Sequence, residues 1–173
     1  MKTMVSTPTA TTTGDATQRI DVRPIAQTDV DAAIAGWHAT NRQTYTYVLA
    51  HQQHTLDDAR RFFVDHVLTE CEVWVVAAAT AGAEALCGVI ALQDGWIRQL
   101  AVFDGWKRRG IGSRLVDLAK TRSPGGLQLH TFERNTPARL FYVRHGFVAI
   151  AFGVSPAPES EPDVLYRWMP TRM

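Results

Sequence analysis

The stretch Leu100-Ala-Val-Phe-Asp-Gly-Trp-Lys-Arg-Arg-Gly-Ile-Gly-Ser-Arg-Leu115 determines how the chain around it can be arranged. Its apolar start is typical of a buried strand, and the spacing of Ile111 and Leu115 is typical of a helix with one buried face. A strand that enters a helix through a glycine loop presents unpaired N–H groups and the positive end of the helix dipole. The sequence therefore predicts an anion site there, suited to phosphate.

Two common phosphate-binding patterns do not fit this loop. The nucleoside-triphosphate loop G-x-x-x-x-G-K-[ST] would use Gly105 and Gly110, but Ile111 stands where lysine is required. The dinucleotide fingerprint needs a third glycine where Leu115 stands, and no initial strand–helix–strand unit precedes the loop. Both classes of nucleotide site are therefore excluded at this position.

A third pattern, [QR]-x-x-G-x-[GA], fits with Lys107 in place of the first residue and with Gly110 and Gly112 as the two small residues. Downstream, Leu127 to Phe147 reads L-x-L-x-T-F-x-x-N-x-x-A-x-x-F-Y-x-x-x-G-F. With these two motifs the chain resembles the GNAT superfamily of N-acetyltransferases. It looks like a small, bacterial-type member whose acceptor the sequence does not name.

Apolar periodicity along the rest of the chain predicts alternating strands and helices. Expected strands cover 20–24, 72–79, 86–92, 96–102, 127–132, 147–154 and 164–169. Expected helices start at the N-caps Thr28 and Thr55, follow the glycine loop, and cover 136–145, with a short helix or helix–loop over 40–50. Asp94-Gly95 predicts a tight hairpin turn.

This order predicts an α+β (mixed α/β) fold, with a mostly antiparallel central sheet of about seven strands and about four flanking helices. The one parallel pair joins 96–102 to 127–132 through a right-handed crossover. We expect a single N-acetyltransferase domain over 19–173. Residues 1–18 are rich in Thr, Ser and Ala and are expected to form a flexible leader.

The composition limits the classes of function. The chain has 173 residues, 46% of them hydrophobic, which suits one core. Its 18 basic and 17 acidic residues argue against nucleic acid or an anionic membrane as the main partner. Two cysteines suggest no disulfide framework, and a cytoplasmic location fits. His51 and His54 lack a third ligand, so we expect no metal site.

The resemblance implies that acetyl-CoA is the co-substrate. In similar proteins the strand before the loop binds the pantetheine arm as an extra strand, and the loop binds the pyrophosphate. These roles fall here on Leu100, Ala101 and Val102, and on Lys107, Arg108, Arg109, Gly110, Ile111, Gly112 and Ser113. The family often has glycine where Arg108 stands, so the role of that side chain stays open.

The resemblance also implies direct transfer of an acetyl group to an amine in a ternary complex, with the Leu100 N–H polarising the thioester carbonyl. Tyr142 matches the tyrosine that reaches the thioester sulfur; its alternative is a core aromatic. Asn135 matches an asparagine that binds pantetheine, or else it caps the following helix. Asp94 is the nearest candidate base, although turn chemistry alone explains it. Deprotonation through water without a dedicated residue is a further alternative.

The acceptor side has softer signals. Trp37, Tyr45, Tyr47 and the loop 155–163 would flank the acceptor, and Glu159, Glu161 and Asp163 either attract a cationic amine or form an ordinary solvated loop. The predicted function is N-acetylation of a primary amine of a small molecule or peptide by a monomer or homodimer. The alternatives are a catalytically silent acyl-CoA-binding regulatory module and an RNA-associated protein, which near-neutral charge disfavours.

Overall fold

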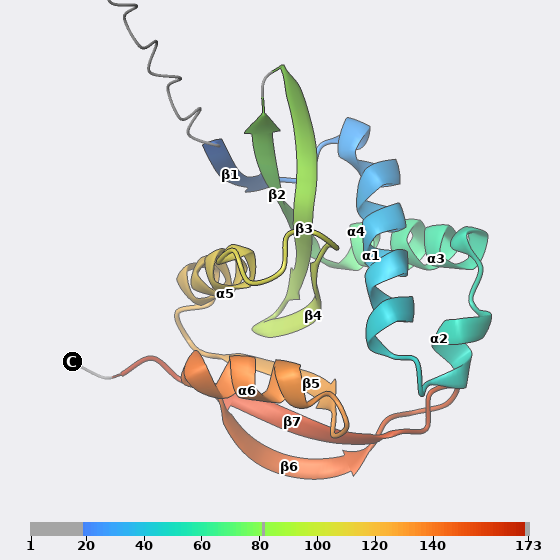
Figure 1. Cartoon of the computed structure of the whole chain (residues 1–173). Helices are drawn as coiled ribbons and strands as arrows, with labels where there is room; N and C mark the ends of the chain where they lie inside the picture. The colour runs from blue at the N-terminus through green and yellow to red at the C-terminus, as the bar shows by residue number, and fades with distance from the viewer. Residues whose placement is uncertain (1–18, 81, 172–173) are drawn as a thin grey trace, which may run out of the picture.

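The computed structural model describes residues 19–80 and 82–171, and it contains one seven-stranded sheet in the order β1-β2-β3-β4-β5-β7-β6 (Figure 1). The strands are β1 (Arg19–Pro24), β2 (Glu72–Thr80), β3 (Ala83–Gln93), β4 (Trp96–Val102), β5 (Leu127–Phe132), β6 (Val148–Val154) and β7 (Pro162–Trp168). Every pairing is antiparallel except β4 with β5. The predicted fold class and its one parallel pair are thus confirmed. The expected leader, 1–18, lies outside the described residues.

Helices cover both faces of the sheet. They are α1 (Val30–Thr44), α2 (Leu49–Gln53), α3 (Leu56–Phe62), α4 (Leu68–Glu70), α5 (Ile111–Arg122) and α6 (Thr136–Arg144), with the short turns η1 (Gln27–Asp29) and η2 (Phe63–Val67). One core joins the sheet to α5 and α6, and the other joins it to α1 and the α3–η2 segment. Figure 1 shows α5 on one side of the sheet and α1 and α3 on the other. We call these the α5/α6 face and the α1 face.

Two helix starts show how local chemistry places the α1 face. The predicted capping box at Thr55 is confirmed, because its Oγ1 accepts from the Asp58 N–H at 3.1 Å. The predicted N-cap at Thr28 is wrong, because the chain enters α1 through η1 instead. Asp29 organises that entry: its carboxylate accepts from the Ala26 N–H at 2.7 Å and from Arg23 of β1 at 2.6 Å. The Arg23 hydrogen bond also lowers the pKa of Asp29.

A glycine lets α1 approach the segment that leaves β4. A Cβ atom built on Gly36 would lie 2.5 Å from the ring of Phe103, which is itself buried. Real Cβ atoms do not approach a packed ring so closely, so only glycine permits this contact. The contact fixes α1 over the end of β4, directly before the glycine loop.

We expect Gly36→Ala to destabilise the protein, although alanine favours helix by about 1 kcal/mol over glycine. Overpacking a core usually costs about 1–3 kcal/mol, so the free energy of unfolding should fall by roughly 1–2 kcal/mol. Urea unfolding measures this change. Ala39→Gly, at an exposed position of the same helix, reports the propensity effect alone. A net stabilisation by Gly36→Ala would contradict the close packing.

Candidate functional site

Strands β4 and β5 separate soon after they meet. Between these two strands, both within the described residues, the single paired position is Trp96 with Gln128. On the other edge of β4, Ala91 pairs with Gln99 but Leu92 pairs with Ile97, so Arg98 is an extra, bulged residue. A bulge bends the strand that contains it. Beyond Arg98 the edge of β4 that faces β5 therefore lacks a strand partner, and a gap opens between the two strands.

The hydrogen-bonding parity of β4 shows which backbone groups border this gap. The Phe103 N–H donates to the Cys87 carbonyl of β3 at 2.9 Å. Because backbone groups alternate along a strand, Ala101 also faces β3, whereas Leu100 and Val102 face the gap. The sequence assigned Ala101 to the cofactor along with its neighbours. The structure instead pairs it with β3 and buries its side chain on the α1 face.

The start of α5 provides unpaired donors at the same end of β4. Gly110 is the N-cap, with φ +79°, and the Arg114 N–H donates to its carbonyl at 3.1 Å. The three preceding amides, those of Ile111, Gly112 and Ser113, precede the first such bond and have no helical acceptor. The basic side chains just before them, Lys107, Arg108 and Arg109, are exposed. The predicted pyrophosphate residues therefore lie together around one positive helix end.

Two residues of the loop are explained by backbone geometry. Arg108 has φ +61°, a left-handed conformation that glycine adopts at no steric cost. This gives a physical reason for the glycine that the family resemblance led us to expect at that position. Gly112 has a packing role as well, because a Cβ atom there would lie 3.1 Å from the Phe141 ring of α6. Glycine at 112 thus holds α5 close to α6.

The Ser113 side chain is tied to α6. His145 Nε2 lies 3.0 Å from Ser113 Oγ, and its Nδ1 lies 2.8 Å from the Phe141 carbonyl. A carbonyl only accepts, so we infer that Nδ1 carries the proton and that the neutral ring accepts from the serine hydroxyl. The backbone N–H of Ser113 is then its group available to an anion.

Tyr142 and Asn135 lie together near the end of α1. Tyr142 is buried among the aromatic rings of Phe147 and Tyr166. Burial, and the neighbouring Tyr45, raise the pKa of Tyr142, so its phenol stays protonated. Asn135 Oδ1 accepts from the Ala138 N–H at 3.2 Å and caps α6, while its side chain also lies beside the Tyr45 phenol. Of the two roles predicted for Asn135, capping is the one its Oδ1 performs.

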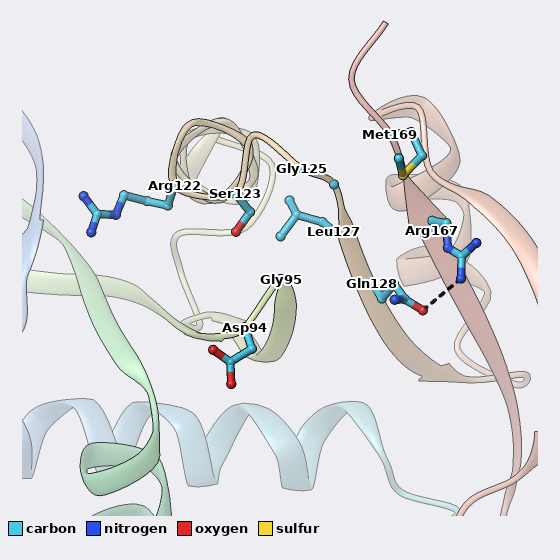
Figure 2. A pocket seen from close by; sticks show the side chains of 10 residues that line it. Asp94, Gly95, Arg122, Ser123, Gly125, Leu127, Gln128, Arg167 and Met169 are labelled. Carbon is cyan, nitrogen blue, oxygen red and sulfur yellow. Dashed lines mark hydrogen bonds between the residues drawn. The ribbon is translucent and has the colours of Figure 1, made fainter. Parts of the chain in front are cut away.

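Asp94 lies apart from this group. It occupies the tip of the β3–β4 hairpin with φ +47° and borders a depression of about 420 Å³ between the end of α5 and the start of β5 (Figure 2). Leu100 is the sixth residue after it, roughly 20 Å along a strand. Turn geometry explains Asp94, and the structure does not place its carboxylate at the gap.

The α1 face carries a second cluster that sequence reasoning did not assemble. Tyr45 packs edge-on against Phe132 with ring centroids 5.1 Å apart, and His51 lies 5.1 Å from Tyr45. His51 Nε2 lies 3.9 Å from Glu159 Oε1, which brings the loop 155–163 to the end of β5. The predicted acceptor-side segments therefore do meet. The sequence offered no signal for His51 in this role, because its partners lie far away along the chain.

A hydrogen bond joins α1 to β4 beside the gap: Trp37 Nε1 donates to Gln99 Oε1 at 3.0 Å. Within 19–80 and 82–171, no group of three or more His, Cys, Asp or Glu side chains is arranged to hold a metal ion. In the same ranges, no helix combines the length and apolar character needed to cross a membrane.

Arg108→Gly should stabilise the protein slightly. A left-handed conformation costs a non-glycine residue roughly 1–2 kcal/mol, and the greater freedom of unfolded glycine offsets about 0.5–1 kcal/mol of that. We expect a gain of about 0.5–1 kcal/mol in denaturant unfolding. Arg109→Gly is the matched control, because Arg109 is the adjacent loop arginine and does not have positive φ. Equal losses in both variants would contradict the strain at Arg108.

His51 should make stability depend on pH. Burial lowers the pKa of His51, against the opposing effect of Glu159, so the unfolded chain binds this proton more readily than the folded chain. The stability that the protein gains from keeping His51 uncharged is therefore lost as pH falls below the ordinary imidazole pKa of about 6.5. Urea unfolding at pH 7.5 and pH 5.5 should show a smaller decline for His51→Gln than for the wild type. Parallel declines would rule out this source.

Known proteins share both the sequence pattern of residues 69–149 and the fold of the chain. Residues 69–149 match a family model described as the acetyltransferase (GNAT) domain. No curated protein sequence matches the chain significantly. The apo form of YjaB from Escherichia coli superposes with a TM-score of 0.69 and 20% identity, over 86% of this chain and 97% of that chain.

Two further solved structures share the fold. The spermidine N-acetyltransferase of Vibrio cholerae, in complex with CoA and spermine, has a TM-score of 0.65 and 16% identity over 86% of this chain and 94% of its own. The ribosomal-protein-S18-alanine N-acetyltransferase of Escherichia coli has a TM-score of 0.62 and 15% identity over 90% and 96%. The family match contains both sequence motifs and the elements from β2 to α6, and the segment 69–149 is therefore an acetyltransferase domain of the GNAT superfamily.

Proposed function

We propose that this protein transfers an acetyl group from acetyl-CoA to a primary amine of a small molecule or peptide, by direct attack in a ternary complex. One observation carries the proposal. The free backbone edge of β4 and the unpaired amides of α5 border the same gap, while an aromatic and acidic cluster lies on the α1 face. Two substrates can thus approach one point from different sides.

The residues present fit acetyl-CoA. Leu100 and Val102 offer backbone groups to an extended amide chain, which is how a strand edge binds a peptide-like arm. The amides of α5 and the exposed Lys107–Arg109 run suit a pyrophosphate, because helix dipole and basic charge both favour anions. Ala101 takes no part in this binding, since its backbone pairs with β3.

The chemistry follows from which groups face the gap. The Leu100 N–H is positioned to donate to the thioester carbonyl oxygen as negative charge develops there. The amine nitrogen bonds to the carbonyl carbon, and the carbon–sulfur bond breaks with its electron pair on sulfur. Tyr142 then gives its proton to the sulfur. Its raised pKa keeps that proton available at neutral pH.

Deprotonation of the acceptor is the remaining requirement. An alkyl ammonium has a pKa of about 10.4, so forming the neutral amine at pH 7 costs roughly 4–5 kcal/mol. A base or a water path to solvent offsets part of this cost. Strand β4, with the sequence WIRQLAV, contains no carboxylate, and Gln99 beside the gap is not a base.

A cationic amine is the acceptor class we favour. Glu159 and Asp163 lie on or beside the acceptor loop and supply negative charge, and Glu161 lies near Tyr47. Structural neighbours act on different amines: one is bound to spermine and another is named for a ribosomal-protein alanine. These neighbours are less than 25% identical to this chain, so they do not select between polyamine and peptide.

Thiol release in the presence of acetyl-CoA and an amine panel tests the proposal. Polyamines, amino acids, aminoglycosides and peptide N-termini cover the candidate acceptors. We expect saturable acetyl-CoA binding and amine-dependent thiol release for at least one class. Absence of acetyl-CoA binding would refute the proposed site. Binding without turnover across the panel would instead favour a regulatory acyl-CoA-binding module.

Tyr142→Phe should lower kcat while sparing acetyl-CoA affinity. General acid catalysis contributes roughly 100-fold or more, and phenylalanine retains the packing against Phe147 and Tyr166. Tyr166→Phe is the matched control, because Tyr166 is a second buried tyrosine and its hydroxyl accepts from Arg139 Nε at 3.2 Å. Unchanged turnover in Tyr142→Phe would remove its role as the acid.

A further inference from the structure

We propose that His130 of β5 is the general base that deprotonates the acceptor amine, and that Asp163 and Trp96 position its imidazole. This inference rests on the proposed acetyl transfer. It assigns the base to a residue at an unspecified position of the second motif, and it replaces the carboxylate expected near the start of β4.

The position of His130 follows from strand alternation. Leu127 and Leu129 are buried in the core on the α5/α6 face, so Gln128, His130 and Phe132 point to the opposite face. Phe132 confirms this direction, because it contacts Tyr45 on the α1 face. Figure 2 shows Gln128 meeting Arg167 of β7 on the same side of the strands. His130 therefore faces the acceptor side of the sheet.

His130 also lies at the right level of the gap. The last β4–β5 pair is Trp96 with Gln128, two residues before His130. On β4, Leu100 is four residues beyond Trp96, but the bulge at Arg98 removes about one residue of rise. The two residues thus lie within roughly 3–4 Å of the same height, on opposite sides of the gap. The Leu100 N–H can then reach the oxygen of a bound thioester carbonyl, while the His130 imidazole reaches the amine that attacks it.

Two contacts hold the ring. His130 Nδ1 lies 3.1 Å from Asp163 Oδ2 of β7. The Trp96 ring stacks on the imidazole with centroids 5.7 Å apart and planes 7° from parallel. Asp163 is itself 92% buried, whereas the His130 side chain is half-exposed. A buried carboxylate on Nδ1 leaves Nε2 as the nitrogen available to an acceptor.

The charged groups around His130 come from two strands and from the His51–Glu159 pair. From β7, Asp163 contacts the ring, and Arg167 lies across from Gln128. From β4, Arg98 lies 5.1 Å from the Trp96 centroid, on the stack that holds the imidazole. The His51–Glu159 pair lies further along, past Phe132. Asp163 is the charged group in direct contact with the ring.

His51 is a weaker candidate for the same step. Its Nε2 is directed to Glu159, and its ring packs among Tyr45, Phe132 and His54. Its Nε2 is thus already paired, whereas the Nε2 of His130 has no partner among the described residues.

The step balances in two proton losses from nitrogen. The ammonium first gives one proton to His130 Nε2, which forms an imidazolium beside the Asp163 carboxylate and returns that proton to solvent. The neutral amine then bonds to the carbonyl carbon, and the sulfur leaves with the electron pair of the carbon–sulfur bond and takes the phenolic proton of Tyr142. The second nitrogen proton is lost to solvent as the amide forms, and the tyrosine regains a proton from solvent.

The experiment measures kcat/KM against pH for wild type, His130→Gln and Asp163→Asn, using the best amine of the panel. Acetyl-CoA hydrolysis without an amine is measured in parallel. For His130→Gln we expect a loss of roughly 100-fold at pH 7 with unchanged acetyl-CoA affinity. The defect should shrink as pH approaches the amine pKa of about 10.4, because the amine then deprotonates without a base.

Asp163→Asn should lower kcat/KM by a smaller factor and move the acid side of the pH profile. A purely structural role for Asp163 would not move that profile. Thermal unfolding verifies that each variant is folded. The matched control is His66→Gln. His66 Nδ1 lies 3.0 Å from Glu70 Oε1, and the His66 side chain is 59% exposed, so this pair resembles that of His130. It lies in the η2–α4 segment, away from β4 and β5.

The outcomes separate the two proposals. A pH-independent defect in His130→Gln, or full activity in that variant, overturns the assignment of the base but leaves acetyl transfer intact. A large, pH-rescued loss in His51→Gln alone transfers the role to His51 and also overturns it. A wild type that binds acetyl-CoA but releases no thiol with amine or water overturns both proposals. Failure to bind acetyl-CoA refutes the cofactor site itself.

Discussion

The separation of β4 from β5 is the constraint on which the rest of the site depends. Neighbouring parallel strands normally pair their facing backbone groups along their whole length. Here β4 and β5 pair at Trp96 and Gln128 and then diverge. The bulged Arg98 bends β4 while β3 continues to satisfy its other edge. The edge of β4 thus keeps free donors and acceptors inside a folded sheet. Unpaired backbone groups destabilise a folded protein unless a ligand or water pairs with them.

Alternation along the strands sorts the chemistry between the two faces. On the α5/α6 face, the core positions Tyr142, and glycine at 112 lets α5 pack on α6. On the α1 face, the Phe132 cluster and the His130–Asp163 pair accompany the acidic loop. A cofactor and an acceptor can consequently meet across the sheet without competing for the same side chains.

Three residues of the glycine loop have different structural roles, although one sequence pattern covers them all. Gly110 supplies a left-handed N-cap, Gly112 supplies a close helix contact, and Arg108 occupies a left-handed conformation without being glycine. The anion-binding donors then follow from the helix start itself. A motif match therefore identifies the loop correctly while leaving the reason for each residue to the three-dimensional contacts.

By itself, the sequence determined what depends on local periodicity and on neighbours in the chain. It predicted the order of strands and helices along the chain, the parallel pair, the capping box at Thr55 and the glycine loop. Each follows from local periodicity, from a short motif or from the handedness of a strand–helix–strand crossover. It misplaced the start of α1, since Arg23 of β1 helps to fix Asp29 there. The separation of Asp94 from the gap, the side of β4 to which Ala101 turns, and the meeting of His130 with Asp163 and Trp96 were decided only by the tertiary structure. Each depends on register and strand divergence, which arise when segments far apart in the chain pack against one another.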